Sequence, residues 1–232
     1  MKVYLTGSSG TIGRYLNFLE PLEIELRNPE TFTKIPTGVH GTVIHLAGVV
    51  GAENVLRNER LSFQINVNGT VEFANVIKQK TNCRFIFVST CHVYKPSTHP
   101  HLEDDPIEPI NAYGWQKRMA EIQLQRLFAD EPNRFTIARL FSILGPNMKK
   151  GTLGWNIERV NASNPIRNVE DVRDFTTPQL ASTMLYKLSQ VEFKFPSYNV
   201  CSGKGKTVRD AAEDLLNSLN IQINANYFIS GN

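Results

Sequence analysis

Cysteine is scarce in this sequence, and the three that occur, Cys83, Cys91 and Cys201, share no short spacing. An odd number of cysteines without such a spacing does not indicate a disulfide framework or a zinc site, so we expect no bound metal. Cys83 opens a predicted strand and Cys201 follows one, and both are interpreted as small residues of the hydrophobic core.

Long apolar runs and a strong charge of one sign are missing as well. No segment approaches the roughly 18 apolar residues that a membrane span requires, and the net charge of +3 is small and spread along the chain. We therefore expect neither a membrane nor nucleic acid as a partner. The first predicted strand begins at residue 2, so we expect no signal peptide before it and a cytoplasmic location.

What the sequence does contain is an alternation of apolar strands with amphipathic helices. This alternation predicts an α/β fold, a doubly wound parallel sheet with helices on both faces. Residues 28–41 are few and rich in Thr, Pro and Gly, so the third strand and helix of a complete fold of this type are expected to be abbreviated there. We expect strands over residues 2–6, 22–27, 42–47, 83–88 and 134–140, and helices over residues 11–19, 60–80 and 111–130.

Three glycines follow the first predicted strand, at Gly7, Gly10 and Gly13. Gly7 can adopt backbone angles that are closed to other residues. Gly10 lets a pyrophosphate approach the main chain, and Gly13 lets the next helix pack closely on the strand. The N–H groups at the start of that helix would face the phosphates. The alternative is a tight turn without a ligand, but the position between a strand and a helix favours a dinucleotide site.

The end of the second predicted strand bears on the choice of cofactor. A residue about 20 positions after the first glycine normally meets the adenosine ribose of the dinucleotide. Arg27 stands there, followed by Asn28. A guanidinium suits a 2′-phosphate, so the sequence favours NADP(H), with NAD(H) as the other possibility. Alternatively, Arg27 stacks on the adenine or is only solvated.

The third predicted strand ends in small residues at Leu46, Ala47 and Gly48, which allow a cofactor ribose to lie close to the backbone. His45 lies within the strand and is interpreted as a hydrogen-bonded core histidine rather than a catalyst. Asn66 lies inside a predicted helix, where asparagine is unfavourable unless it bonds neighbouring backbone. We therefore interpret Asn66 as support for the cofactor site.

The fourth predicted strand runs into a polar cluster at residues 89–92, and ligands bind at such strand ends in an open α/β sheet. Tyr113 and Lys117 follow on one face of the next helix, one turn apart. An ammonium together with an oxidised nicotinamide favours the phenolate of a tyrosine that otherwise titrates at about pH 10. Such a tyrosine can exchange a proton with an alcohol or carbonyl while a hydride moves, and Ser89 or Thr90 can orient the substrate oxygen.

In these motifs the sequence resembles the extended short-chain dehydrogenase/reductases, and among them the NAD-dependent epimerase/dehydratase family, which acts on nucleotide sugars. The matching segments lie in the family's order across nearly the whole chain. As a set they are specific to the family, although not to one substrate. They are Thr6–Gly13, His45–Gly48, Ile65–Thr70, Val88–Tyr94, Glu103–Pro106, Tyr113–Lys117, Arg139–Pro146, Arg173–Phe175 and Tyr198–Val200.

The resemblance implies a Rossmann-type fold. It implies an NAD(P)-binding domain over residues 1–145 and a reduced C-terminal substrate-binding lobe over residues 146–232, interleaved with the last elements of the sheet. Relatives carry a larger lobe, so the substrate cover here is expected to be small or supplied by a partner subunit. The resemblance also implies a homodimer, formed through the helices at 60–80 and 111–130, and a role in polysaccharide biosynthesis.

The resemblance also assigns site residues by position. Tyr113 is similar to the family's proton donor or acceptor, Lys117 to its partner, and Thr90 to the residue that binds the reacting oxygen. The residues implied for the substrate are Cys91, His92, Ser142 and Arg173. Those implied for the cofactor are Gly7, Ser9, Gly10, Thr11, Ile12, Gly13, Arg27, Asn28, Leu46, Ala47, Gly48, Asn66, Val88, Tyr113 and Lys117.

Some positions depart from the family pattern. Cys91 and His92 stand where the sugar dehydratases carry Asp-Glu, so a 4,6-dehydratase is not expected. A cysteine and a histidine act as acid and base in the fucose-synthase-like epimerase-reductases, but the spacing here differs by one residue. The alternative is a buried thiol and a histidine that caps a loop. Ser142 occupies a position where relatives usually carry an asparagine.

These observations predict an NAD(P)-dependent nucleotide-sugar oxidoreductase, most simply a 4-keto-sugar reductase that uses Tyr113, Lys117 and Thr90. A nucleotide-sugar 4-epimerase, which uses the same residues twice, is the first alternative. A non-catalytic NAD(P)-binding module is the second, and the presence of Tyr113 and Lys117 argues against it.

Overall fold

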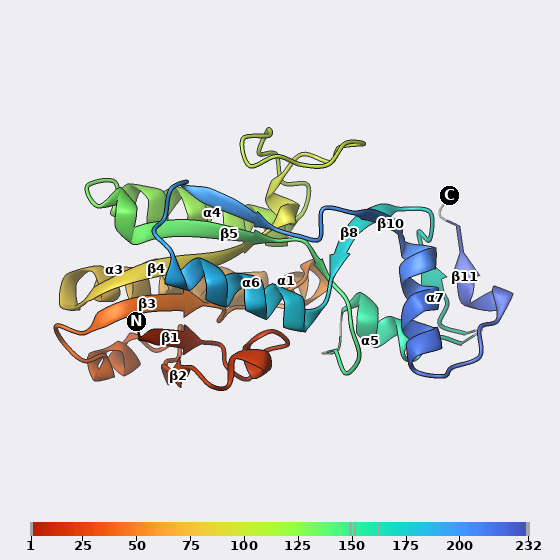
Figure 1. Ribbon diagram of the computed structural model, residues 1–232, viewed down its shortest axis with the longest axis horizontal. Coiled ribbons are helices and arrows are strands. Elements are labelled where there is room, and N and C mark those ends of the chain that lie inside the picture. The colour runs from red at the N-terminus through yellow and green to blue at the C-terminus, as the bar shows by residue number, and fades with distance from the viewer. Residues whose placement is uncertain (1, 149, 151, 162, 231–232) are drawn as a thin grey trace.

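Six parallel strands form the main sheet, in the order β2-β1-β3-β4-β5-β9 (Figure 1). The computed structural model describes residues 2–148, 150, 152–161 and 163–230. The predicted α/β fold with a parallel sheet is confirmed. The strands of this sheet are β1 (Val3–Thr6), β2 (Glu20–Pro21), β3 (His40–His45), β4 (Asn82–Thr90), β5 (Phe135–Leu140) and β9 (Ser197–Val200).

Helices cover both faces of this sheet. Phe85 and Phe87 of β4 point into the core under α3 and α4, whereas Ile86 and Val88 point into the core under α6. Alternate residues of one strand therefore serve two cores, as a strand buried on both faces requires. The helices are α3 (Thr70–Lys80) and α4 (Ala112–Leu127) on one face, and α6 (Pro178–Gln190) with a short 3₁₀ helix (Gly13–Leu16) on the other.

The second strand lies earlier, and is much shorter, than residues 22–27. The N–H of Leu22 still donates to the oxygen of Leu5 at 2.7 Å, and after this bond the chain leaves the sheet. Leu22 and Ile24 pack against the core on the α3 side although they belong to no strand. The prediction of a strand over residues 22–27 is wrong, because alternating apolar residues report one buried face and not a pairing partner.

The α-helix predicted over residues 11–19 is also wrong. The structure has one turn of 3₁₀ helix there, Gly13–Leu16. The glycine turn occupies the first half of the connection and β2 already begins at Glu20, so too little chain is left for an α-helix. The helix end expected to face the phosphates is therefore reduced to a single turn.

The helix predicted over residues 60–80 is confirmed, but it consists of three consecutive pieces. α2 (Glu59–Phe63) leads into a π-helical turn (Gln64–Gly69), which leads into α3. A further short helix, α1 (Ala52–Arg57), precedes them. The helix predicted over residues 111–130 is α4, and the expected abbreviation of residues 28–41 is seen as a 3₁₀ helix (Pro29–Lys34) in place of a strand.

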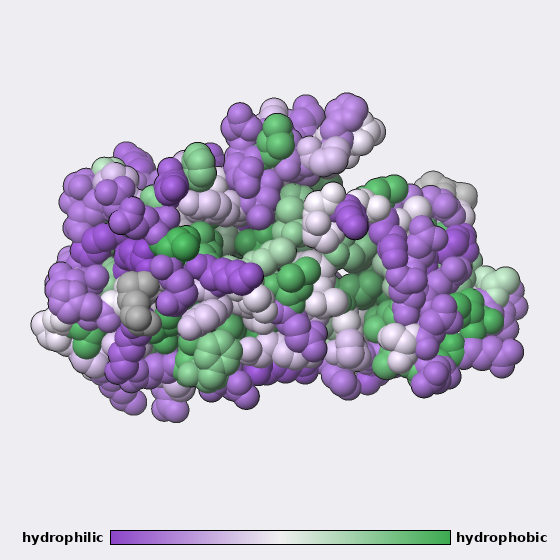
Figure 2. All heavy atoms as spheres, in the orientation of Figure 1, coloured by the Kyte–Doolittle hydropathy of each residue, from purple (hydrophilic) through white to green (hydrophobic). Residues whose placement is uncertain are grey.

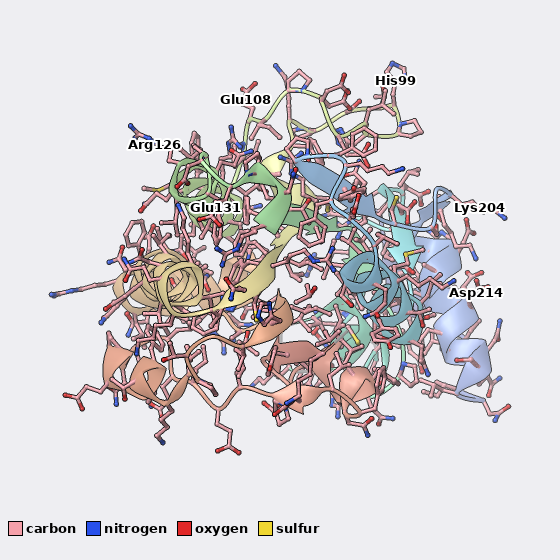
Figure 3. All side chains as sticks on the ribbon, turned by 60° about the vertical axis from the view of Figure 1, so that its left-hand side comes forward. His99, Glu108, Arg126, Glu131, Lys204 and Asp214 are labelled. Atoms are coloured by element: carbon pink, nitrogen blue, oxygen red, sulfur yellow. The ribbon has the colours of Figure 1, made fainter. Side chains whose placement is uncertain are left out.

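The segment between β4 and α4 projects from the molecule, as the labelled His99 and Glu108 show in Figure 3. At its base the N–H of Lys95 donates to the oxygen of Pro106 at 3.0 Å. Further along, the oxygen of Glu103 accepts from Arg139 Nη1 at 3.0 Å. The first bond closes the base of the projecting segment, and the second ties the segment to β5.

The chain after β5 builds a third hydrophobic core beside the sheet, on the right in Figure 1. Figure 2 shows apolar side chains gathered where this part meets the sheet. α6 and β9 return to the main sheet, and the division of the chain at residue 145 into two functional parts stays a prediction. The remaining elements are β6 (Ser142–Ile143), α5 (Leu153–Ile157), β7 (Ile166–Arg167), β8 (Val172–Thr176), β10 (Gly205–Thr207), α7 (Val208–Ser218) and β11 (Phe228–Ile229).

Among the residues that the structure describes, no helix has both the length and the apolar character needed to cross a membrane. Over the same residues, no three His, Cys, Asp or Glu side chains are grouped as metal ligands would be. Cys83 is buried, whereas Cys201 is only partly buried, so the interpretation as a core residue is confirmed for Cys83 alone.

Candidate active site

The glycine turn after β1 lies against the loop that follows β3. Gly7 has a φ of +72°, and a Cβ atom there would come within 2.8 Å of the nitrogen of Ala47. Only glycine fits this position, because the turn after β1 packs directly against the backbone of the loop after β3. The N–H of Gly10 donates to the oxygen of Gly7 at 2.9 Å, while the N–H groups of Thr11 and Ile12 have no partner in the described part of the chain. Free backbone donors beside glycines fit a phosphate group.

A chain of hydrogen bonds runs through His45 at the end of β3. The hydroxyl oxygens of Thr6 and Thr70 lie 2.9 and 3.2 Å from its Nδ1 and Nε2. Thr6 Oγ1 accepts from the N–H of Ala47 and the Thr70 hydroxyl donates to the oxygen of Ile65, so the ring accepts at Nδ1 and donates at Nε2. Burial lowers the pKa of His45 to about 3 and keeps the ring neutral. The interpretation of His45 as a core histidine is confirmed.

Asn66 fixes the shape of the loop after β3. The N–H of Val49 donates to Asn66 Oδ1 at 2.8 Å, and Asn66 Nδ2 donates back to the oxygen of Val49 at 2.9 Å. The side chain of Asn66 therefore supports the loop after β3 by bonding to the backbone of Val49, which belongs to no strand. Contact of Leu46, Ala47 and Gly48 with a cofactor stays a prediction.

α4 begins directly against the 3₁₀ turn Cys91–Val93 that follows β4. A Cβ atom at Gly114 would lie 2.2 Å from the oxygen of His92, so only glycine allows this approach. The ring centre of Tyr113 lies 6.0 Å from that of His92. The hydroxyl of Thr90, the last residue of β4, lies near enough to the Tyr113 phenol to act on its pKa. The structure thus brings Thr90, His92 and Tyr113 together at the carboxyl end of β4.

Tyr113 is buried, with 7% of its surface exposed. Burial raises the pKa of Tyr113 above its usual range, the thiolate form of Cys91 adds to this rise at high pH, and the Thr90 hydroxyl opposes it. Lys117 is not among the groups that shift this pKa. The protein alone therefore does not produce the expected phenolate, because loss of water around the phenol outweighs any help from the amine. A phenol that keeps its proton at neutral pH is suited to donate it.

Lys117 is buried one helical turn beyond Tyr113. Its Nζ lies 4.0 Å from the centre of the Phe87 ring, and no hydrogen-bond acceptor for it occurs among the residues described. Burial lowers the pKa of Lys117 to about 7, against the opposing effect of the Glu121 carboxylate. Lys117 is buried as a residue but its Nζ has no protein acceptor in the part of the chain that the structure describes, so this position fits a site that is completed by the oxygens of a ligand.

Beside Lys117 lies a buried ionic cluster that was not expected from the sequence. Glu121 is fully buried and accepts from the Ser89 hydroxyl at 2.6 Å and from two nitrogens of Arg139 at 3.2 and 3.1 Å. Because the Ser89 hydroxyl is used in this cluster, Thr90 is the residue left to face a substrate oxygen. A glutamate four residues after Lys117 and an arginine inside an apolar strand are the signals that could have indicated it.

Of the residues predicted for the substrate, Cys91, His92 and Arg173 lie near one another. Arg173 of β8 lies near Cys91 and His92, since its charge acts on the pKa of both. Burial raises the pKa of Cys91 to about 11 and lowers that of His92, so both groups are neutral at pH 7. Ser142 lies on the neighbouring strand β6, where it pairs with Phe175.

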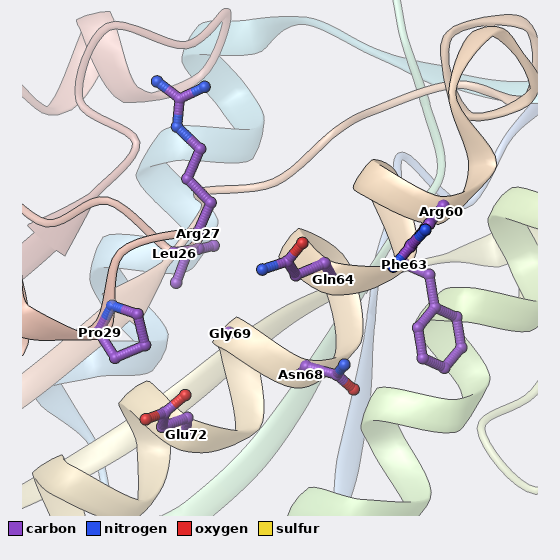
Figure 4. A pocket seen from close by; sticks show the side chains of 9 residues that line it. All are labelled: Leu26, Arg27, Pro29, Arg60, Phe63, Gln64, Asn68, Gly69 and Glu72. Atoms are coloured by element: carbon purple, nitrogen blue, oxygen red, sulfur yellow. The ribbon is translucent and has the colours of Figure 1, made fainter.

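A cavity of about 490 Å³ opens beside Arg27, at the edge of the sheet (Figure 4). This volume lies in the range of ligand pockets, which is roughly 300–1,000 Å³. Arg60, from α2, brings a second guanidinium to its wall and was not expected there. Asn28 instead caps a 3₁₀ helix, accepting from the N–H of Glu30 at 3.3 Å. The other lining residues are Leu26, Pro29, Phe63, Gln64, Asn68, Gly69 and Glu72.

The remaining residues predicted for the cofactor differ in exposure. Ser9 is exposed in the glycine turn, whereas Ile12 and Gly13 are buried in it. Val88 is 6% exposed and belongs to the core on the α6 side. Their contact with a cofactor stays a prediction.

Comparison with known proteins agrees with this arrangement. The model of a family described as the NAD dependent epimerase/dehydratase family matches residues 17–201. The chain is 27% identical to a GDP-6-deoxy-D-mannose reductase of Pseudomonas aeruginosa, over 96% of this chain and 81% of that protein. It is 31% identical to a UDP-glucose 4-epimerase of Pisum sativum, over 56% of this chain but only 38% of the epimerase.

Solved structures with the same fold extend over nearly the whole chain. The structure of RMD from Pseudomonas aeruginosa complexed with NADPH superposes with a TM-score of 0.85 and 23% identity, covering 99% of this chain and 87% of that one. A UDP-glucose 4-epimerase of Thermus thermophilus in complex with NAD superposes with a TM-score of 0.79 and 19% identity, covering 96% of this chain and 84% of that one. At these identities the likeness shows the fold.

Proposed function

The chain belongs to the NAD-dependent epimerase/dehydratase family, and we propose that it reduces a nucleotide-linked 4-keto sugar with NADPH. The observation that carries this proposal is the group of Thr90, Tyr113 and Lys117 at the carboxyl end of β4, where a protonated phenol and an unpaired amine lie one helical turn apart. Similarity to a reductase along nearly the whole chain supports it.

The residues around the glycine turn fit a nicotinamide dinucleotide. The free N–H groups of Thr11 and Ile12 would hold its pyrophosphate, and ribose hydroxyls would supply the acceptor that Lys117 lacks. Arg27, beside the cavity, favours a 2′-phosphate and therefore NADP(H) over NAD(H). When bound, NADPH supplies the hydride.

In this proposal Thr90 and Tyr113 hold the carbonyl oxygen of the sugar by hydrogen bonds. Tyr113 donates its proton to that oxygen as the carbonyl becomes an alcohol, which is possible because burial keeps the phenol protonated. The phenolate that is left then regains its proton from solvent, while Lys117 holds the ribose of the cofactor. The pKa of Lys117, at about 7, makes both of its forms available near neutral pH.

We assign the substrate side to Cys91, His92, Arg173 and Ser142. Arg173 offers a guanidinium to the diphosphate of a nucleotide sugar. The raised pKa of Cys91 keeps its thiol protonated, which favours simple reduction over an inversion that would need a thiolate base.

A nucleotide-sugar 4-epimerase is the second candidate, favoured by the similarity to UDP-glucose 4-epimerases. It would use Tyr113 and Lys117 twice, once to oxidise and once to reduce the same sugar. It would retain its NAD between turnovers, whereas a reductase exchanges NADPH for NADP. A non-catalytic dinucleotide-binding module would do neither.

We further propose a homodimer that forms through α4 and its neighbour α3. Trp115, Met119 and Ile122 on α4 are 53%, 38% and 42% exposed and follow one helical stripe. The cysteines of the described chain are all free, which is consistent with the proposed cytoplasmic location.

The proposal is tested by titrating the purified protein with NADPH and NADH and then adding a panel of nucleotide 4-keto sugars. A fall in nicotinamide absorbance that depends on one of these sugars supports a reductase. Tightly retained NAD, with interconversion of two nucleotide hexoses and no net fall in absorbance, would show the epimerase instead. Binding without either reaction would show the non-catalytic module.

A further inference from the structure

Gln116 is a buried amide in the middle of the proposed catalytic group. It lies on α4 between Tyr113 and Lys117 and is 3% exposed. Neither the motifs of the sequence nor the proposed reaction gives it a role. A glutamine is rarely buried without a reason, because each of its polar atoms then needs a partner.

The partners of Gln116 lead away from α4 to the loop after β3. Its Oε1 accepts from Asn66 Nδ2 at 3.0 Å, and its Nε2 donates to Ser62 Oγ at 3.0 Å. Asn66 holds Val49 with its two remaining bonds. The bonds of Asn66 and Gln116 thus form one continuous hydrogen-bond network from Val49 to α4. If either side-chain amide were flipped, at least one of these bonds would pair two donors or two acceptors.

The backbone that carries Asn66 is itself unusual. Asn66 lies in the π-helical turn Gln64–Gly69, between α2 and α3. Such turns are rare and occur frequently at functional sites. The side chain of Asn66 is 1% exposed, and it faces both the loop and α4 from this turn.

We propose that Gln116 is a positioning residue, which couples the loop after β3 to the helix that carries Tyr113 and Lys117. This inference rests on the proposed function in one respect, namely that the loop meets the dinucleotide. A dinucleotide that presses on Ala47 and Gly48 then also fixes α4, through Val49, Asn66 and Gln116. The loop thereby adds a hydrogen-bonded link to the contacts that hold the catalytic helix in register.

The test compares Gln116→Met, which keeps the length of the side chain and removes its hydrogen bonds, with Gln123→Met on the exposed side of the same helix. Hydrogen exchange at the Val49 amide should be about tenfold faster in Gln116→Met without any ligand, although residue 116 does not touch Val49. The dissociation constant for NADPH should rise about threefold or more, and kcat should fall about tenfold, because a small misplacement of reacting groups is costly. The control should match the wild type in all three.

A second variant breaks the same link from its other end. Asn66→Asp keeps an acceptor for the N–H of Val49 and loses the donor both to Gln116 and to the oxygen of Val49. It should show the same fall in kcat, and it decides the matter if Gln116→Met does not fold. Wild-type exchange at Val49 and wild-type NADPH binding in Gln116→Met would overturn the coupling. If instead the wild type reduces no 4-keto sugar, the proposed function fails, while the exchange measurement still tests Gln116.

Discussion

The ammonium of Lys117 lies 4.0 Å from the centre of the Phe87 ring, and in the described chain it has no hydrogen-bond acceptor. An aromatic face offers a cation about 0.5–2 kcal/mol. Burial of an ionised amine costs more than that, as the lowered pKa of Lys117 reflects. The folded protein without a ligand is therefore destabilised at this residue, which is understandable if a ligand completes the site.

Replacement of this amine should stabilise the protein without cofactor. The folded pKa of Lys117, about 7, lies below the ordinary value of 10.5, so the unfolded chain binds more protons between these two pH values. We expect Lys117→Met to raise the free energy of unfolding by about 2 to 4 kcal/mol at pH 6. The gain should shrink as the pH rises from about 7 toward 10.5. Chemical denaturation at pH 6 and pH 9.5 measures it, with the exposed Lys187→Met as control. A gain in unfolding free energy that is the same at both pH values would contradict a lowered pKa for the buried amine of Lys117.

Cofactor preference should depend on Arg27. Arg27→Asp should lower the preference for NADPH over NADH at least about tenfold, because hydrogen bonds to charged groups contribute roughly 1.5–3 kcal/mol. Dissociation constants for both cofactors, measured by fluorescence titration, give the ratio. Arg167→Asp, at an exposed position of β7 and not among the residues that line the cavity, is the matched control. An unchanged ratio in Arg27→Asp would mean that this guanidinium meets no 2′-phosphate.

A simple reduction should not need the thiol of Cys91. Cys91→Ala should therefore keep kcat within about threefold of the wild type, since a thiol with a pKa of about 11 cannot serve as a base near pH 7. Steady-state kinetics with a circular dichroism check of folding measures this. A folded but inactive variant would favour the chemistry that inverts a sugar centre.

The proposed dimer should depend on the stripe on α4. A charge at its centre, Met119→Glu, should convert the dimer to a monomer in sedimentation velocity, because an unpaired carboxylate would be buried at the interface. Gln179→Glu, at an exposed position of α6 and not on α4, should leave the dimer intact. A wild type that sediments as a monomer at all concentrations would remove the basis for the dimer.

The sequence predicted well what depends on local pattern. The glycine turn and the helix with Tyr113 and Lys117 could be recognised because each depends on a few neighbouring residues, and so could the parallel sheet. The absence of a strand at residues 22–27 could not be predicted in this way, because a strand also needs a neighbouring strand to pair with, and residues 22–27 have none. The 3₁₀ turn at Gly13–Leu16 likewise follows from where β2 begins.

Properties of the site that depend on contacts between residues far apart in the chain could not be predicted from the sequence either. The state of Tyr113 is decided by burial, which assembles only when α4 packs on the turn after β4. Ser89 of β4 and Arg139 of β5 bond to Glu121, and Asn66 of a π-helical turn bonds to Gln116. No short-range spacing in the chain connects these residues.

The central claim is that the buried phenol of Tyr113 delivers the proton during reduction of a nucleotide 4-keto sugar. It is tested most directly by following NADPH absorbance with the wild type and Tyr113→Phe, together with NADPH titration of both proteins. We expect Tyr113→Phe to lose turnover by about 100- to 10,000-fold, the usual range for removal of a general acid, while its NADPH affinity stays nearly the same. Turnover in Tyr113→Phe equal to that of the wild type would contradict the account.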